Sequence, residues 1–182
     1  MLKAKEILGV KPQVPHAIVK GEGVIEHFGI RAPAANDRQS VGKVPEELPP
    51  ISEEGVRALK GDWGYRIPLA QVCNQNCWLL GAGSAHFKSA HLSLAYLHFS
   101  DQAEANAAIG TRHSLHFHSR SWEYYVVLKG TKTVQVAGEL VTIETGEILE
   151  VPPQVRHGLH SRQAPYEGFT FRVPADVADK FV

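Results

Sequence analysis

The sequence predicts an all-β protein built as a double-sheet jelly roll. From Gln71 to Val173 the chain is a succession of short segments rich in aromatic and β-branched residues, each bounded by glycine, proline or a polar turn. These segments recur about every ten residues, which is typical of sandwiches and barrels. A chain of 182 residues can bury such a core without disulfides, so one main domain is expected.

The composition narrows the class of ligand and the cellular compartment. Nineteen basic residues balance nineteen acidic ones, and no long run of either sign is present, so neither nucleic acid nor a membrane surface is an expected partner. A small, uncharged or mildly polar substrate is expected. The first residues lack the apolar core of a signal peptide, and no apolar run reaches the ~20 residues that cross a bilayer. A cytoplasmic protein is therefore predicted.

The two cysteines, Cys73 and Cys77, are four positions apart. This spacing matches neither the common zinc pattern nor a redox C-x-x-C motif. Two half-buried free thiols are the expected state. A disulfide between them is the alternative.

Residues 1–72 are interpreted as an N-terminal arm that packs on the main domain. Residues 2–8 favour a short helix that ends at Gly9, and residues 18–30 suggest one or two short strands broken by glycines. The proline-rich stretch of residues 31–50 predicts a surface loop. A serine followed by two acidic residues predicts a helix over residues 52–60.

Residues 73–182 are expected to form the barrel domain. Its strands are predicted within residues 71–83, 91–100, 114–118, 122–129, 132–138, 139–145, 147–152, 156–161 and 168–173. Phe169 and Phe171 alternate with Thr170 and are expected to fill the core. The tail from Pro174 to Val182 begins with a proline that suits a first helical turn, so a short C-terminal helix is predicted.

The chemistry concentrates between Gly110 and Gly130. Alternate residues of a strand share a face, so His116 and His118 point the same way. Glu123 begins the next strand after a polar turn and can bring a carboxylate to the same point. Two histidines and one carboxylate form an open set that is characteristic of non-haem iron, although Mn, Ni, Cu or Zn also bind to it.

This stretch resembles the first motif of the cupin superfamily. That motif runs glycine, five residues, His-x-His, three or four residues, glutamate, six residues, glycine, and Gly110, His116, His118, Glu123 and Gly130 fit it. The second cupin motif is matched in part. Its matching positions are Gly146, Pro152 and His157, while Gln154 replaces a glycine and Ser161 replaces an asparagine.

The resemblance implies a small jelly-roll barrel that holds one divalent transition metal per chain, with iron first among the candidates. His116, His118, Glu123 and His157 would be its ligands, leaving two neighbouring positions for substrate oxygens. A non-haem iron dioxygenase acting on a small oxygenated molecule is the leading hypothesis. A non-redox isomerase or epimerase, and a non-catalytic cupin that binds a small molecule, are the alternatives.

Other residues receive secondary roles. Tyr125 shares strand parity with Glu123, so its hydroxyl either assists catalysis by donating to a bound ligand or belongs to a core tyrosine. Arg112 and His113 precede the ligand strand at the expected rim, and His160 should point away from the metal. A long arm and an exposed sheet edge predict a homodimer.

Overall fold

The computed structural model describes residues 5–14, 16, 23–24, 27–32, 60–61, 64–69, 76–82, 87–107, 115–176 and 178–182. Contacts within the chain divide it into two compact units. The first comprises residues 1–31 with 35–72, and the second comprises residues 32–34 with 73–182. Each unit is described by itself below.

The first unit contains an antiparallel sheet in the order β1 (Glu6–Val10), β3 (Gly64–Pro68) and β2 (Lys60–Gly61). The short helix predicted over residues 2–8 is therefore wrong where the structure describes it, because residues 6–8 pair with β3. Pairing with a neighbouring strand has overridden a weak local helical preference. The helix predicted over residues 52–60 lies outside the described residues except for its last residue, which belongs to β2.

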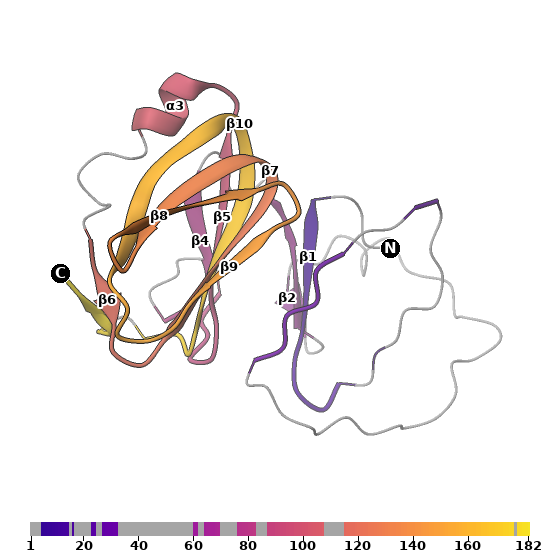
Figure 1. Cartoon of the computed structure of the whole chain (residues 1–182). Coiled ribbons are helices and arrows are strands. Elements are labelled where there is room, and N and C mark those ends of the chain that lie inside the picture. Colours follow the sequence, from indigo (N-terminus) through magenta and orange to yellow (C-terminus); the bar gives the residue numbers. More distant parts are fainter. Residues whose placement is uncertain are drawn as a thin grey trace. The chain divides into compact units, whose positions relative to one another are not determined.

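The second unit is an all-β jelly roll, as predicted. Its strands are β4 (Asn76–Leu80), β5 (Ser93–Phe99), β6 (Phe117–His118), β7 (Trp122–Val136), β8 (Glu139–Glu144), β9 (Ile148–Val151), β10 (His157–Val173) and β11 (Lys180–Phe181). The main sheet has the order β4-β5-β10-β7-β8, with β9 also paired to β7, and β11 pairs with β6. Figure 1 shows β7 to β10 curving around a common interior, with α3 (Gln102–Ala107) beside one end of β10.

The strands β7 and β10 are long and each replaces two predicted strands. Gly130, read from the sequence as a break, lies inside β7 with φ +79°, and a Cβ there would lie 2.5 Å from the carbonyl oxygen of Gln163. Only glycine takes this conformation beside a neighbouring backbone without strain. One half of β7 pairs with β9 and the other half with β8, so the strand turns from one sheet layer to the other.

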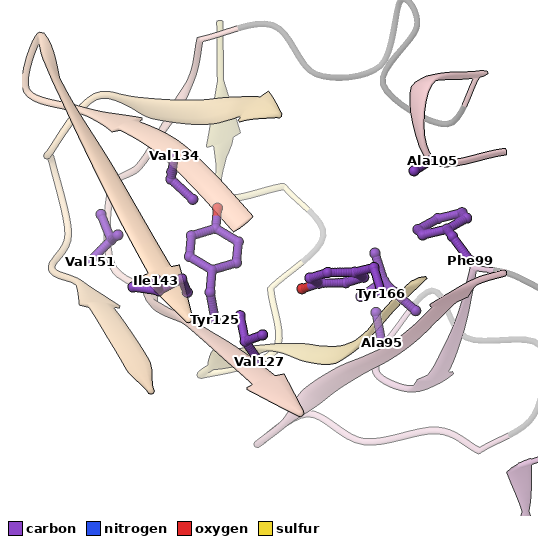
Figure 2. Close-up of a cluster of buried hydrophobic side chains, with 10 residues drawn as sticks. Ala95, Phe99, Ala105, Tyr125, Val127, Val134, Ile143, Val151 and Tyr166 are labelled. Carbon is purple, nitrogen blue, oxygen red and sulfur yellow. The ribbon is translucent and has the colours of Figure 1, made fainter. Parts of the chain in front are cut away.

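The inner face of the barrel is identified by its register. Thr170 pairs with Tyr125 and with Ala95, and both partners belong to the buried core cluster shown in Figure 2. Thr170 is itself buried. Because neighbours along a strand face opposite sides, Phe169 and Phe171 lie on the outer face. The prediction that these two phenylalanines fill the barrel core is therefore wrong.

The outer phenylalanines pack against aromatic neighbours on adjacent strands. The Phe169 ring lies 5.4 Å from the Tyr96 ring, and the Phe171 ring stacks on Tyr124 at 4.6 Å between centroids. Both faces of this sheet are thus rich in apolar groups, and hydrophobicity alone does not identify the inner one.

The C-terminal tail also differs from the prediction. Its described residues form a turn and then β11, not a helix, and Phe181 stacks on Phe117 at 5.2 Å between ring centroids. Cys77 is disulfide-bonded, so the expectation of free thiols is wrong for this residue; Cys73, the other cysteine of the chain, lies outside the described residues. In the described part of the chain, no helix has the length and apolar character required to cross a membrane.

Candidate metal centre

Two backbone hydrogen bonds join the segments that carry the candidate ligands. The amide of His116 donates to the carbonyl of His157 at 2.9 Å, and the amide of His157 donates back to the carbonyl of His116 at 2.8 Å. His118 follows in β6, and Glu123 lies near the start of β7. This pairing brings histidines 41 positions apart in the chain to the same point.

Three imidazole nitrogens converge on one carboxylate oxygen, Oε2 of Glu123. The Nε2 atoms of His157, His118 and His116 lie 2.9, 3.0 and 3.7 Å from it. The His118, His157 and Glu123 side chains are buried, and the His116 side chain is 12% exposed. One ligand atom from each of the four residues lies within 4.8 Å of the others.

The spacing of these atoms fits a transition metal. Ligand atoms bound at about 2.1 Å and separated by a right angle lie about 3.0 Å apart, close to the two shortest distances in this cluster. Three imidazoles with one carboxylate are a donor set suited to iron, manganese, nickel, copper or zinc. The four residues named from the sequence are therefore together and correctly spaced for a divalent cation.

The outer nitrogens of two rings indicate how the inner nitrogens are protonated. Nδ1 of His118 lies 3.0 Å from the carbonyl oxygen of Asp179, and Nδ1 of His157 lies 2.8 Å from that of Val155. A carbonyl only accepts, so both Nδ1 atoms carry a proton, and with a metal bound each ring would turn an Nε2 lone pair toward the ion. Lone pairs at about 3 Å from the Glu123 carboxylate repel it unless a cation lies between them.

The C-terminal tail supports the turn between His118 and Glu123. The buried Asp179 carboxylate accepts hydrogen bonds from the amides of Ser119, Arg120 and Ser121 and from the Ser119 hydroxyl. Burial raises the pKa of Asp179, but these hydrogen bonds prevail and hold it well below its ordinary value. Asp179 was not identified from the sequence, because nothing in its local pattern points to a turn some sixty residues earlier.

The electrostatics of the cluster favour an ionised Glu123. Burial raises its pKa, but the close contacts with His116, His118 and His157 and the charge of His157 hold the pKa well below its ordinary value. Tyr125 shows the opposite behaviour. Burial, the charge of Glu123 and a hydrogen bond to that carboxylate raise the pKa of the Tyr125 phenol well above its usual range.

The structure places the secondary candidates as follows. Tyr125 is buried on the inner face, with its ring 6.3 Å from that of His157. His160 is exposed, as expected for a residue that points away from the cluster. Arg112 and His113, expected at the rim, lie outside the described residues, as does Gly110.

The second motif keeps its backbone shape despite a substitution. Gln154, which replaces the motif glycine, adopts φ 67°, in the left-handed region that glycine prefers. Its amide donates to the carbonyl of His118 at 2.6 Å. The loop before His157 is thus bonded to the strand that carries His118.

Two basic residues of the inner face were not identified from the sequence. Lys132 and Arg162 are buried and lie opposite each other in the register of β7 and β10. Lys132 also lies opposite the core residue Ile143 in the register of β7 and β8. Lys132 shares strand parity with the apolar residue Val134, and this pattern could have indicated that the lysine faces inward. Arg162 had no such pattern, because the bulges of β10 interrupt its alternation.

Comparison with known proteins identifies a family for part of the chain. Residues 104–165 match the family model described as Cupin domain. No curated protein matches the chain.

Several solved structures resemble the chain in part. KdgF from Halomonas sp. is 18% identical, with 50% of this chain and 74% of that chain covered and a TM-score of 0.39. Streptomyces Pac13, described as a nucleoside dehydratase, is 18% identical, with 56% and 72% covered and a TM-score of 0.40. The DMSP lyase DddQ from Ruegeria pomeroyi DSS-3 is 16% identical, with 62% and 54% covered and a TM-score of 0.45.

Proposed function

We propose that the chain, whose residues 104–165 match the Cupin domain family model, is a non-haem iron dioxygenase acting on a small oxygenated molecule. One observation carries the proposal: three imidazole nitrogens converge on Oε2 of Glu123 inside the barrel. A bound iron would supply Lewis acidity and a redox centre at this point. Four protein ligands leave positions for the substrate oxygens.

The protein groups around the cluster have definable roles in this proposal. The neutral phenol of Tyr125 holds its proton beside Glu123 and can donate a hydrogen bond to a substrate oxygen. The fully buried side chains of Val127, Val134 and Val151 exclude water from the same face. His116 has the largest exposed fraction of the four ligands, 12%, and so marks the side on which a substrate reaches the cluster.

A second candidate is a non-redox enzyme that isomerises its substrate through an enediol. It is favoured by Lys132, whose Nζ lies 3.6 Å from the centroid of the Tyr125 ring. Burial and the charge of Arg162 lower the pKa of Lys132 well below its ordinary value, so the amine gives up its proton more readily than an exposed lysine and can serve as a base. Such a base is needed to enolise a carbonyl compound and is not needed to bind dioxygen.

Metal analysis and oxygen uptake test the proposal. The protein is purified without added metal, its metals are quantified, and iron is then restored anaerobically. Oxygen consumption is measured with catechols, enediols and hydroxy-keto acids. The proposal predicts one iron per chain and uptake of one dioxygen per product. Failure to bind iron, or binding without oxygen consumption for any compound, would refute the dioxygenase.

Lys132→Met distinguishes the two candidates. An isomerase loses its base and most of its turnover, which is followed by exchange of the substrate hydrogen with solvent deuterium. A dioxygenase keeps its chemistry apart from changes in substrate binding. A chain that binds metal and ligand but catalyses neither reaction is a binding cupin. The small-molecule substrate and the homodimer remain proposals, and sedimentation of the metal-loaded chain tests the dimer.

A further inference from the structure

Basic side chains lie opposite each other on the inner face of the barrel. Lys132 on β7 and Arg162 on β10 stand directly opposite each other in the ladder. Arg172, two residues beyond the inner residue Thr170, pairs with Glu123 and lies with its guanidinium carbon 4.8 Å from the centroid of the Trp78 ring. Two basic side chains opposite each other destabilise a sheet when both are charged, so the presence of this pair requires an explanation.

The buried carboxylates of the described residues do not neutralise this face. They are Glu123 and Asp179. Glu123 belongs to the metal cluster, and Asp179 is occupied by the turn at residues 119–121. The balanced net charge of the chain conceals this local excess of positive charge.

Arg162 is buried with part of its hydrogen-bonding capacity unused. The residue is 4% exposed, and its Nε and Nη1 find no hydrogen-bond partner in the described part of the chain. Its guanidinium carbon lies 5.1 Å from the Phe99 ring centroid and 5.7 Å from that of Tyr166. These ring contacts hold the cation but do not satisfy its N–H groups, which native proteins seldom leave unpaired.

A buried hydroxyl accompanies the arginine. Tyr166 is fully buried, and its Oη has no hydrogen-bond partner among the described residues. Figure 2 shows this hydroxyl pointing away from Phe99 and toward the side of the cluster where Tyr125 lies. The absent side chain of Gly168 makes room for it, because a Cβ there would lie 2.6 Å from the Tyr166 oxygen. Two kinds of unused donor are thus present on one face.

We propose that this face binds the carboxylate of an anionic substrate, with Arg162 as the charged partner and the Tyr166 hydroxyl as a second donor. The inference rests on the proposed function, since the oxygenated end of the same substrate would lie at the His116, His118, Glu123 and His157 cluster. A carboxylate accepts several hydrogen bonds and supplies the negative charge that the inner face lacks. The substrate class is therefore a small carboxylic acid that also bears an oxygen for the metal.

Ligand-dependent thermal unfolding tests the subsite apart from the metal chemistry. The full chain, freed of metal and chelator, is titrated with acetate, acetamide and inorganic phosphate at constant ionic strength. Acetate is expected to raise the Tm in proportion to its occupancy, whereas the uncharged acetamide does not. The metal-loaded chain should show the same preference.

Arg162→Met is the decisive variant. Removal of a buried cation with unused donors should raise the Tm in buffer alone and weaken acetate binding by roughly tenfold or more. Tyr166→Phe should keep the fold and weaken binding less. The control, Arg156→Met, removes an exposed arginine and should change neither property.

Three results would overturn the subsite: no response to acetate in the wild-type chain, an equal response in Arg162→Met, or a response to phosphate without one to acetate. If Arg162→Met fails to fold, Tyr166→Phe alone decides, since loss of an unpaired hydroxyl spares the core. Iron binding and oxygen uptake are measured separately. A Tm response to acetate without oxygen uptake would refute the dioxygenase and support the subsite. Oxygen uptake without a Tm response to acetate would support the dioxygenase and refute the subsite.

Discussion

Replacement of Asp179 by alanine removes the acceptor that holds the turn between two candidate ligands. Its shortest backbone bonds come from the amides of Ser121 and Ser119, at 2.8 and 2.9 Å. A hydrogen bond to a buried charge contributes about 1.5 kcal/mol at the low end, so the loss of these two bonds costs about 3 kcal/mol of unfolding free energy. That is a large part of the stability of an ordinary domain.

The same replacement should weaken metal binding. Release of the tail withdraws the Asp179 carbonyl from Nδ1 of His118, so the ring loses the contact that orients Nε2 toward the cluster. Loss of such an outer contact typically lowers metal affinity by about 10- to 100-fold. Urea unfolding measures the first effect, and competition with a chromophoric chelator measures the second.

A neighbouring aspartate provides the control. Asp176 lies on the same tail and pairs with the exposed side chain of Arg120. A surface pair contributes about 0–1 kcal/mol, so Asp176→Asn should leave both stability and metal affinity nearly unchanged. If Asp179→Ala unfolds at the same urea concentration as the wild type and binds zinc equally well, the tail has no part in organising the centre.

Three further outcomes are expected. His116→Ala and Glu123→Ala should each lose the metal, measured by elemental analysis, while the far-ultraviolet circular dichroism stays β-rich; full metal occupancy in either would contradict the ligand assignment. Gln154→Gly should stabilise the domain by up to about 1 kcal/mol in urea unfolding, because glycine adopts its positive φ without strain. Burial raises the pKa of all five tyrosines, that of Tyr166 to about 12. The native chain should therefore show little phenolate absorbance near pH 10 and should lose stability as the pH rises further. Titration of the folded chain with the pKa of free tyrosine would refute this.

Strand parity accounts for what was predictable about the centre. The alternation of His116 with His118 and of Glu123 with Tyr125 needs only the two-residue period of a strand, and the structure places these four side chains together. The assignment of His157 as a ligand depended on the resemblance to a known motif, since its contact with His116 spans 41 positions. The local sequence pattern does not predict which strands pair when they are so far apart in the chain.

The errors have a common origin in partners remote in sequence. Phe169 looked like a core residue because the outer face of this sheet is also apolar. The tail after Pro174 looked helical because its composition permits a helix, whereas Asp179 and Phe181 find their partners beside β6. Lys132 and Arg162 were given no role from the sequence, and only the register across β7 and β10 places them inside.

The reciprocal bonds between His116 and His157, together with the contact of Asp179 with His118 across 61 positions, have a consequence for the order of folding. Such long loops close late, after local hairpins have formed. The four-residue cluster is therefore complete only when the barrel is closed and the tail is docked. Metal uptake by the refolding chain should lag behind the gain of β-structure, which makes the bound ion a reporter of the last step of folding.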